Sequence, residues 1–136
     1  MMAMPLIAID TNIILRFLTR QPKVQFDAAR ALFRKGGLLV SVPVVMEVYF
    51  TLTGNVLDFS EDEALSALDA VLQLPGVTVQ NAETVFAAVG FAKLGMPFKD
   101  ACVLAFSAEA SQLVTFDKPF VKRAAKLGLL PEVLAP

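Results

Sequence analysis

The apolar run Leu6-Ile7-Ala8-Ile9 ends directly at an acidic residue, Asp10. A short run of aliphatic residues of this kind is typical of a buried strand. The run Leu113-Val114-Thr115-Phe116 ends in the same way, at Asp117. Because ligands gather at the carboxyl ends of parallel strands, an acid in this position is a candidate for a functional site. The two stretches predict both the fold class and the edge of the sheet that carries the chemistry.

Between these two runs, strand-like segments alternate with longer amphipathic segments. Strands are predicted at about 6–9, 38–42, 77–79 and 112–115. Strands that alternate with helices are typical of a parallel sheet with helices on both faces. A chain of 136 residues suits one compact domain. The sequence therefore predicts an α/β protein in which residues 1–136 form a single three-layer domain, with a central, mainly parallel sheet flanked by helices.

Several helix ends carry recognisable signals. The segment Ser60-Glu61-Asp62-Glu63 fits a capping box, in which the serine and the glutamate three residues later bond each other's backbone. Prolines mark two helix starts, at Pro22 and Pro43, and glycines mark two helix ends, at Gly36 and near Gly128. These signals predict helices in the segments between the strands.

A hydrophobic content of 56% raises the question of a membrane protein. Residues 36–57 carry one charge, the central Glu47, and glycines interrupt them, so they do not provide the roughly 20 apolar residues of a span. Met1–Ile9 lacks the basic region and the long apolar stretch of a signal peptide. The lone Cys102 excludes an intramolecular disulfide and most simply belongs to the core. We expect a cytoplasmic protein without a membrane partner.

The chain contains no histidine. Serine–histidine catalysis, cysteine–histidine catalysis and histidine–zinc sites are therefore excluded. A Gly-x-Ser-x-Gly elbow, a phosphate-binding loop and a Gly-x-Gly-x-x-Gly run are also absent from the sequence. The net charge of −1 creates no global field that recruits nucleic acid, so any polyanion has to be held locally.

Four acids lie within or at the end of apolar stretches, namely Asp10, Glu47, Asp100 and Asp117. A carboxylate in apolar surroundings is costly unless a cation or a proton neutralises it. Two carboxylates about 4 Å apart repel by roughly 4 kcal/mol at an effective dielectric of about 20. Carboxylate oxygens suit Mg²⁺ or Mn²⁺, which bind phosphate oxygens and activate water. If the fold brings the four acids together, they predict metal-dependent hydrolysis of a phosphodiester.

Each of the four acids also has a structural alternative. Asp10, Asp100 and Asp117 stand at predicted helix starts, where a carboxylate commonly caps the free amides. Glu47 can instead belong to a structural salt bridge. Only the four acids taken together favour a metal site over these local roles.

The acids belong to four short motifs, Ile9-Asp10-Thr11-Asn12, Glu47, Phe98-Lys99-Asp100-Ala101 and Thr115-Phe116-Asp117. In type and order these motifs resemble those of the PIN-domain nucleases, above all the VapC toxins of toxin–antitoxin pairs. The resemblance extends over nearly the whole chain in length, element order and acid spacing. It implies a metal-dependent endoribonuclease that cuts RNA with Mg²⁺ or Mn²⁺.

The resemblance also implies roles for individual residues. The four acids would be the catalytic residues and the metal ligands, with Asn12 and Thr115 as polar supporting groups. Asn12 and Thr115 fit local backbone-bonding roles equally well. Some members of the family carry a further acid shortly after the fourth, where this chain has Lys118 and Pro119. Both one and two bound ions therefore stay open.

Basic residues near the acids are candidates for contacts with RNA phosphates, because an acidic cleft repels its substrate unless cations offset the field. The alternative for the C-terminal ones is a solvated helix face that matches the helix dipole, which we favour for Lys126. The candidates for RNA binding are Arg16, Lys99, Lys118, Lys122 and Arg123.

The apolar surplus predicts protein partners. Large apolar residues near predicted helix ends suggest more apolar surface than a monomer of this size usually exposes. We expect a homodimer and a cognate antitoxin protein to cover it. The residues concerned are Phe17, Leu18, Val56, Leu57 and Phe59.

Two other classes of function compete with the nuclease. A non-catalytic PIN-like module that binds RNA or protein would keep the fold without the cut, but this chain retains all four acids. A magnesium-dependent phosphatase would carry an Asp-x-Asp pair, and here the position two residues after Asp10 is Asn12. The sequence therefore favours the nuclease.

Overall fold

The structure, a computed structural model, describes residues 5–136. The chain forms two compact units, unit 1 up to Ala82 and unit 2 from Glu83 to Pro136, and each is described by itself. The expectation that Met1–Ile9 is no signal peptide falls partly on residues 1–4, which lie outside the described part. Within residues 5–136, no helix is both long enough and apolar enough to cross a bilayer.

Unit 1 contains a parallel sheet with the strand order β1-β2-β3. Leu38 in the middle strand pairs with Ile7 on one side and with Val77 on the other. The elements of this unit are β1 (Ile7–Ala8), α1 (Thr11–Thr19), α2 (Lys23–Lys35), β2 (Leu38–Val40), α3 (Val42–Leu52), α4 (Glu61–Leu72) and β3 (Val77–Val79).

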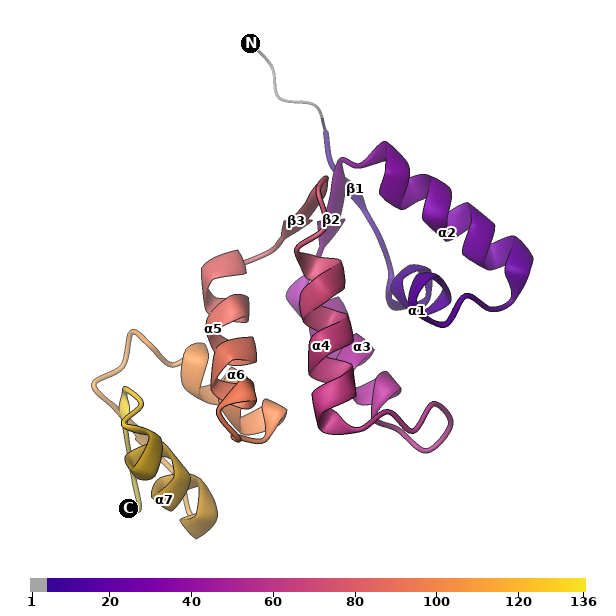
Figure 1. Ribbon diagram of the computed structural model, residues 1–136. Coiled ribbons are helices and arrows are strands. Elements are labelled where there is room, and N and C mark those ends of the chain that lie inside the picture. Colours follow the sequence, from indigo (N-terminus) through magenta and orange to yellow (C-terminus); the bar gives the residue numbers. More distant parts are fainter. Residues whose placement is uncertain (1–4) are drawn as a thin grey trace. The chain divides into compact units, whose positions relative to one another are not determined.

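The helices of unit 1 pack on one another and on the sheet (Figure 1). Helix α1 contacts α2 and α3, α3 contacts α4, and α4 contacts β3. Ile14, Leu38, Val48 and Leu68 are fully buried and come from α1, β2, α3 and α4. A shared core therefore holds the sheet and these helices in place.

Two glycines allow β2 and β3 to begin side by side. Gly36 and Gly76 have positive φ angles of 74° and 84°. A Cβ added at Gly76 would lie 2.7 Å from the Cα of Gly36, and the Leu38 amide donates to the Gly76 carbonyl at 2.9 Å. A side chain at position 76 would therefore push the two strand starts apart.

Unit 2 contains a second parallel pair of strands, in which Leu113 pairs with Val133. The sequence predicts the first of these strands but not the second, β5. Cys102 is buried, as expected, and burial raises the pKa of its thiol to about 11. The elements are α5 (Ala82–Lys93), whose first residue is the last of unit 1, α6 (Phe98–Ala105), β4 (Gln112–Val114), α7 (Lys118–Leu127) and β5 (Glu132–Leu134).

The predicted α/β class, with parallel strands and intervening helices, is confirmed. The capping box is confirmed as well, because the Ser60 hydroxyl accepts from the Glu63 amide at 3.1 Å and the Glu63 carboxylate accepts from the Ser60 amide at 2.9 Å. Helix α2 ends at Gly36 and α7 ends at Gly128, as the glycines predict.

Candidate active site

Asp10 lies between β1 and α1 and is the N-cap residue of α1. Its Oδ1 accepts a hydrogen bond from the Thr11 amide at 2.7 Å. The side chain is exposed, and Oδ2 makes no hydrogen bond or ion pair within residues 5–136. The capping alternative for Asp10 is therefore confirmed, but one carboxylate oxygen is still available to a cation.

Glu47 lies in the second turn of α3, on its exposed face. Val45 and Val48 point inward and are buried, whereas the helical period directs Glu47 outward. The expectation that apolar residues surround Glu47 is therefore wrong. Glu47 forms no ion pair within the described residues of unit 1, so the salt-bridge alternative finds no partner there. Gln80 fixes the start of α3, since its Oε1 accepts from the Val42 amide at 2.9 Å.

Asp100 lies in the first turn of α6, after the N-cap residue Pro97. The capping alternative for Asp100 is therefore wrong. The side chain is half-buried, and burial together with the nearby Asp117 carboxylate raises the pKa of Asp100. The cations Lys99 and Arg123 partly offset this rise in pKa. The surroundings of Asp100 therefore oppose its charged form.

Asp117 is the N-cap residue of α7, as the capping alternative has it. Its Oδ1 accepts from the Phe120 amide at 3.1 Å, and its own amide donates to the Thr115 hydroxyl at 3.0 Å. Thr115 thus supports the loop that carries Asp117, which is one of the two roles that the sequence leaves open for it. Asn12 is exposed at the second position of α1.

The structure brings Asp100 and Asp117 together in unit 2, whereas Asp10 and Glu47 both belong to unit 1. In the described part of the chain, no three acidic or cysteine side chains are placed to hold a metal ion. The convergence of all four acids is therefore still a prediction.

The side chains present suit a hard divalent cation. The four acids offer only oxygen ligands, which Mg²⁺ and Mn²⁺ prefer. The thiol of Cys102 is buried and its raised pKa keeps it protonated, so it offers no soft ligand. A cation near Asp100 would relieve the burial and repulsion that raise its pKa. The residues therefore fit the metal that the fold implies.

Arg16 is held in place by a partner that the sequence does not reveal. Its Nε donates to the Gln25 Oε1 at 2.7 Å, which links α1 to α2. The bond leaves the terminal nitrogens of the guanidinium for another acceptor. Lys99 is exposed next to Asp100, and its positive charge acts to lower the pKa of Asp100.

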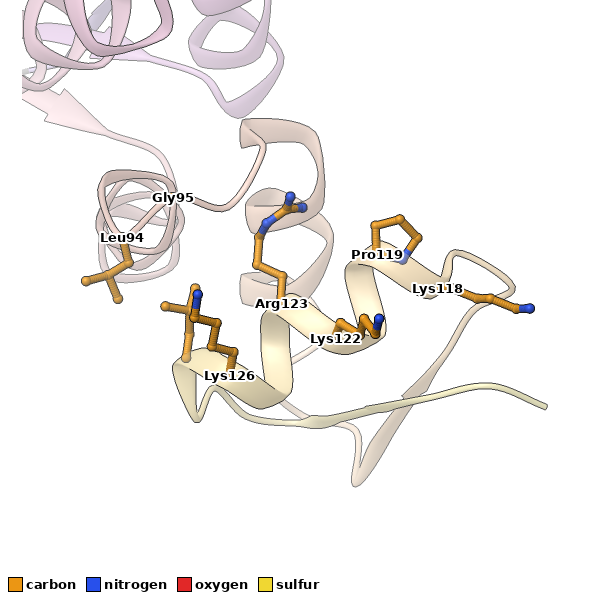
Figure 2. A pocket seen from close by; sticks show the side chains of 8 residues that line it. Leu94, Gly95, Lys118, Pro119, Lys122, Arg123 and Lys126 are labelled. Carbon is orange, nitrogen blue, oxygen red and sulfur yellow. The ribbon is translucent and has the colours of Figure 1, made fainter.

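The other predicted RNA-binding residues share one groove in unit 2, with a volume of about 660 Å³. Figure 2 shows Lys118, Lys122, Arg123 and Lys126 projecting from α7, with Leu94 beside the far end of that helix. Lys126, for which we favour a role as a solvated face residue, belongs to the same groove. The residues that line it are Leu94, Gly95, Lys118, Pro119, Lys122, Arg123, Lys126 and Leu127.

Asp10 and Asp117 follow the carboxyl ends of the parallel strands β1 and β4, where ligands bind in folds of this class. The PIN-domain family model matches residues 7–126, and the chain belongs to this family. PIN domains are generally nuclease modules and typically depend on divalent metals. No curated protein matches the sequence.

The hydrogen bonds of the caps lead to a prediction about Asp117. We expect Asp117→Ala to lower the free energy of unfolding by about 0.5–2 kcal/mol, because the Phe120 amide loses its acceptor. Asp117→Asn keeps an amide oxygen in the same place and should preserve that free energy. Urea melts in EDTA measure both. Equal stability of the alanine and asparagine variants would contradict the capping role.

Proposed function

We propose that this PIN-domain protein is an endoribonuclease in which Asp10, Glu47, Asp100 and Asp117 hold Mg²⁺ or Mn²⁺. The proposal includes a biological role as the toxin of a type II toxin–antitoxin pair. The observation that carries the nuclease class is the match of the PIN-domain family over residues 7–126. The Asp100–Asp117 pair supports the metal site, because burial and a second carboxylate oppose the charged state of Asp100. A cation bound between the first turn of α6 and the N-terminus of α7 would relieve both effects.

We assign different roles to the four acids of the proposed metal site. Asp100 and Asp10 are the strongest candidates for direct ligands, since Asp100 has no capping bond and Asp10 keeps Oδ2 available. Glu47 would complete the ligand set or hold a water in position. Asp117 keeps one oxygen on the Phe120 amide, which suits it to a second ion or to an outer water.

A bound Mg²⁺ or Mn²⁺ would supply charge to the phosphodiester oxygens and make a water molecule a better nucleophile. Basic side chains near the acids would offset their negative charge, which otherwise repels the phosphates of the RNA. Lys99 and Arg123 already interact with Asp100, and Arg16 is oriented by Gln25. Each of these three side chains has donors left over and would bind an RNA phosphate.

Metal dependence is the first test of this proposal. We expect Mg²⁺ or Mn²⁺ to raise the melting temperature, because the ions bind the folded acids and not the unfolded chain. At a hundredfold excess over Kd, the free energy of unfolding should rise by about 2.7 kcal/mol. EDTA should reverse this shift and abolish cleavage. Calorimetric melts and RNA cleavage assays measure the two effects, with NaCl at matched ionic strength as the control. Cleavage that survives EDTA would contradict the mechanism.

A groove in unit 1 supports the proposed antitoxin partner. It measures about 780 Å³ and is lined by no acid. Its aromatic rings pack on one another, with the Phe17 and Phe33 centroids 4.3 Å apart, so they form an apolar floor and not an open stacking platform for bases. Three arginines flank this floor, so an acidic and apolar protein segment fits best. The lining residues are Phe17, Leu18, Arg20, Phe26, Arg30, Phe33, Arg34, Leu74 and Pro75.

Exposed apolar side chains support the proposed homodimer. Val56 is 94% exposed, and Phe116 is 88% exposed. Leu57 and Phe59, which the sequence suggests as surface residues, are only half-buried. A second copy of the chain would remove part of this apolar area from water. Equilibrium sedimentation of wild type and Val56→Asp tests this part of the proposal.

A further inference from the structure

The cationic groove of unit 2 has an internal order along α7. Lys118, Lys122 and Lys126 are spaced by four residues, so they follow one another on one side of the helix, about 6 Å apart along its axis. All three are exposed and line the groove. We refer to these three lysines as the lysine ladder.

The ladder has no structural explanation in unit 2. None of the three lysines forms an ion pair within the described residues. Like charges four residues apart on a helix repel one another. The helix dipole favours Lys126 in the last turn, but it disfavours Lys118, which is the first residue of the helix. The solvated, dipole-matched face that we favour for Lys126 from the sequence therefore does not account for the ladder.

The ladder starts at the acid pair. Asp117 caps α7 immediately before Lys118. Arg123, which also lines the groove, interacts with Asp100. Two residues of the groove, Lys118 and Arg123, therefore adjoin the two acids, and at the other end of α7 Leu94 and Lys126 lie close to each other (Figure 2).

We infer that the lysine ladder is a track for the backbone of single-stranded RNA on one side of the scissile phosphate. The spacing of the lysines along α7 is comparable with that of successive phosphates in an extended strand. Leu94, Pro119 and Leu127 give the groove apolar walls suited to ribose and base carbons. This inference rests on the proposed nuclease function and adds where the substrate lies: about three nucleotides on one side of the cut would follow α7.

RNA binding measured in EDTA tests the track independently of cleavage. The triple variant Lys118→Gln/Lys122→Gln/Lys126→Gln should bind a single-stranded RNA roughly a hundredfold more weakly at about 0.1 M salt, because each phosphate contact contributes about 0.7 to the slope of log K against log salt. That slope should therefore fall by about 2. Fluorescence anisotropy over a salt series measures both quantities.

Lys35 provides a matched control, because it is also an exposed lysine in the last turn of a helix, α2. Lys35→Gln should change the slope much less than Lys126→Gln, and Lys126→Arg should bind like wild type because it keeps the charge. An unchanged slope in the triple variant, or equal effects at positions 35 and 126, would overturn the track. Failure of the nuclease proposal would appear separately, as wild-type protein that binds RNA without manganese-dependent cleavage.

The substrate side gives a second test of the same inference. Removing nucleotides from one side of the cleavage site should raise KM stepwise over about three positions, whereas removing them from the other side should not. The triple variant should lose this asymmetry. Equal sensitivity to shortening on both sides would contradict a track that leads away from Asp117 in one direction only.

Discussion

Asp100→Asn is expected to reduce RNA cleavage by roughly a thousandfold or more, since it removes a ligand from a metal that contributes several kcal/mol to the transition state. The same change should leave the metal-free protein equally or more stable. The reason is that burial and the Asp117 carboxylate penalise the charged form of Asp100. Cleavage assays with manganese and urea melts in EDTA measure the two effects. A large loss of stability would instead show a structural role.

The pH dependence of stability provides a control for this prediction. The pKa of Asp100 is raised in the folded protein, so the folded state holds this proton more tightly than the unfolded state. The free energy of unfolding should therefore fall as the pH rises from the ordinary value of 3.8 through the raised native pKa. Asp100→Asn removes this contribution. Its stability should match wild type below that window and exceed it above.

Expression of the wild-type chain alone is expected to arrest bacterial growth, and expression of Asp100→Asn is not. The reason is that the proposed toxin acts by destroying RNA, which requires the metal site. Colony counts after tightly controlled induction, with mapping of the 5′ ends of RNA fragments, measure the effect. Equal toxicity of both proteins would contradict the nuclease toxin and favour a non-catalytic binding module.

Rescue by an antitoxin tests the groove of unit 1 separately from the active site. Arg30→Glu combined with Arg34→Glu reverses the charge of two exposed residues that line the groove. This double variant should remain toxic but lose rescue by the cognate antitoxin, because an acidic segment would then face like charges. Unchanged rescue would show that the partner binds elsewhere.

Local signals in the sequence predict much of the fold. The Ser60–Glu63 capping box and the glycines after α2 and α7 are confirmed because the interactions behind them join residues close in sequence. The strand β5 has no such signal. It comprises three residues shortly after Pro131, too few to show an alternating pattern, and it exists because it pairs with β4.

The surroundings of the acids are harder to predict. Apolar neighbours in sequence suggest that Glu47 is enclosed, yet the turn of α3 exposes it. The position of Asp100 near a helix start suggests a cap, yet Pro97 takes that place. The hydrogen bonds between Gln80 and Val42 and between Gln25 and Arg16 depend on the tertiary fold, so no local sequence pattern predicts them.

We propose that Asp10, Glu47, Asp100 and Asp117 bind the same metal ion. Binding of Mn²⁺, measured by electron paramagnetic resonance of the free ion, tests it most directly. Asp10→Asn, which keeps a side-chain oxygen for the cap, should weaken Mn²⁺ binding as Asp100→Asn does, because each removes one negative ligand from the same ion. Mn²⁺ binding that is lost in Asp100→Asn but unchanged in Asp10→Asn would contradict a shared site.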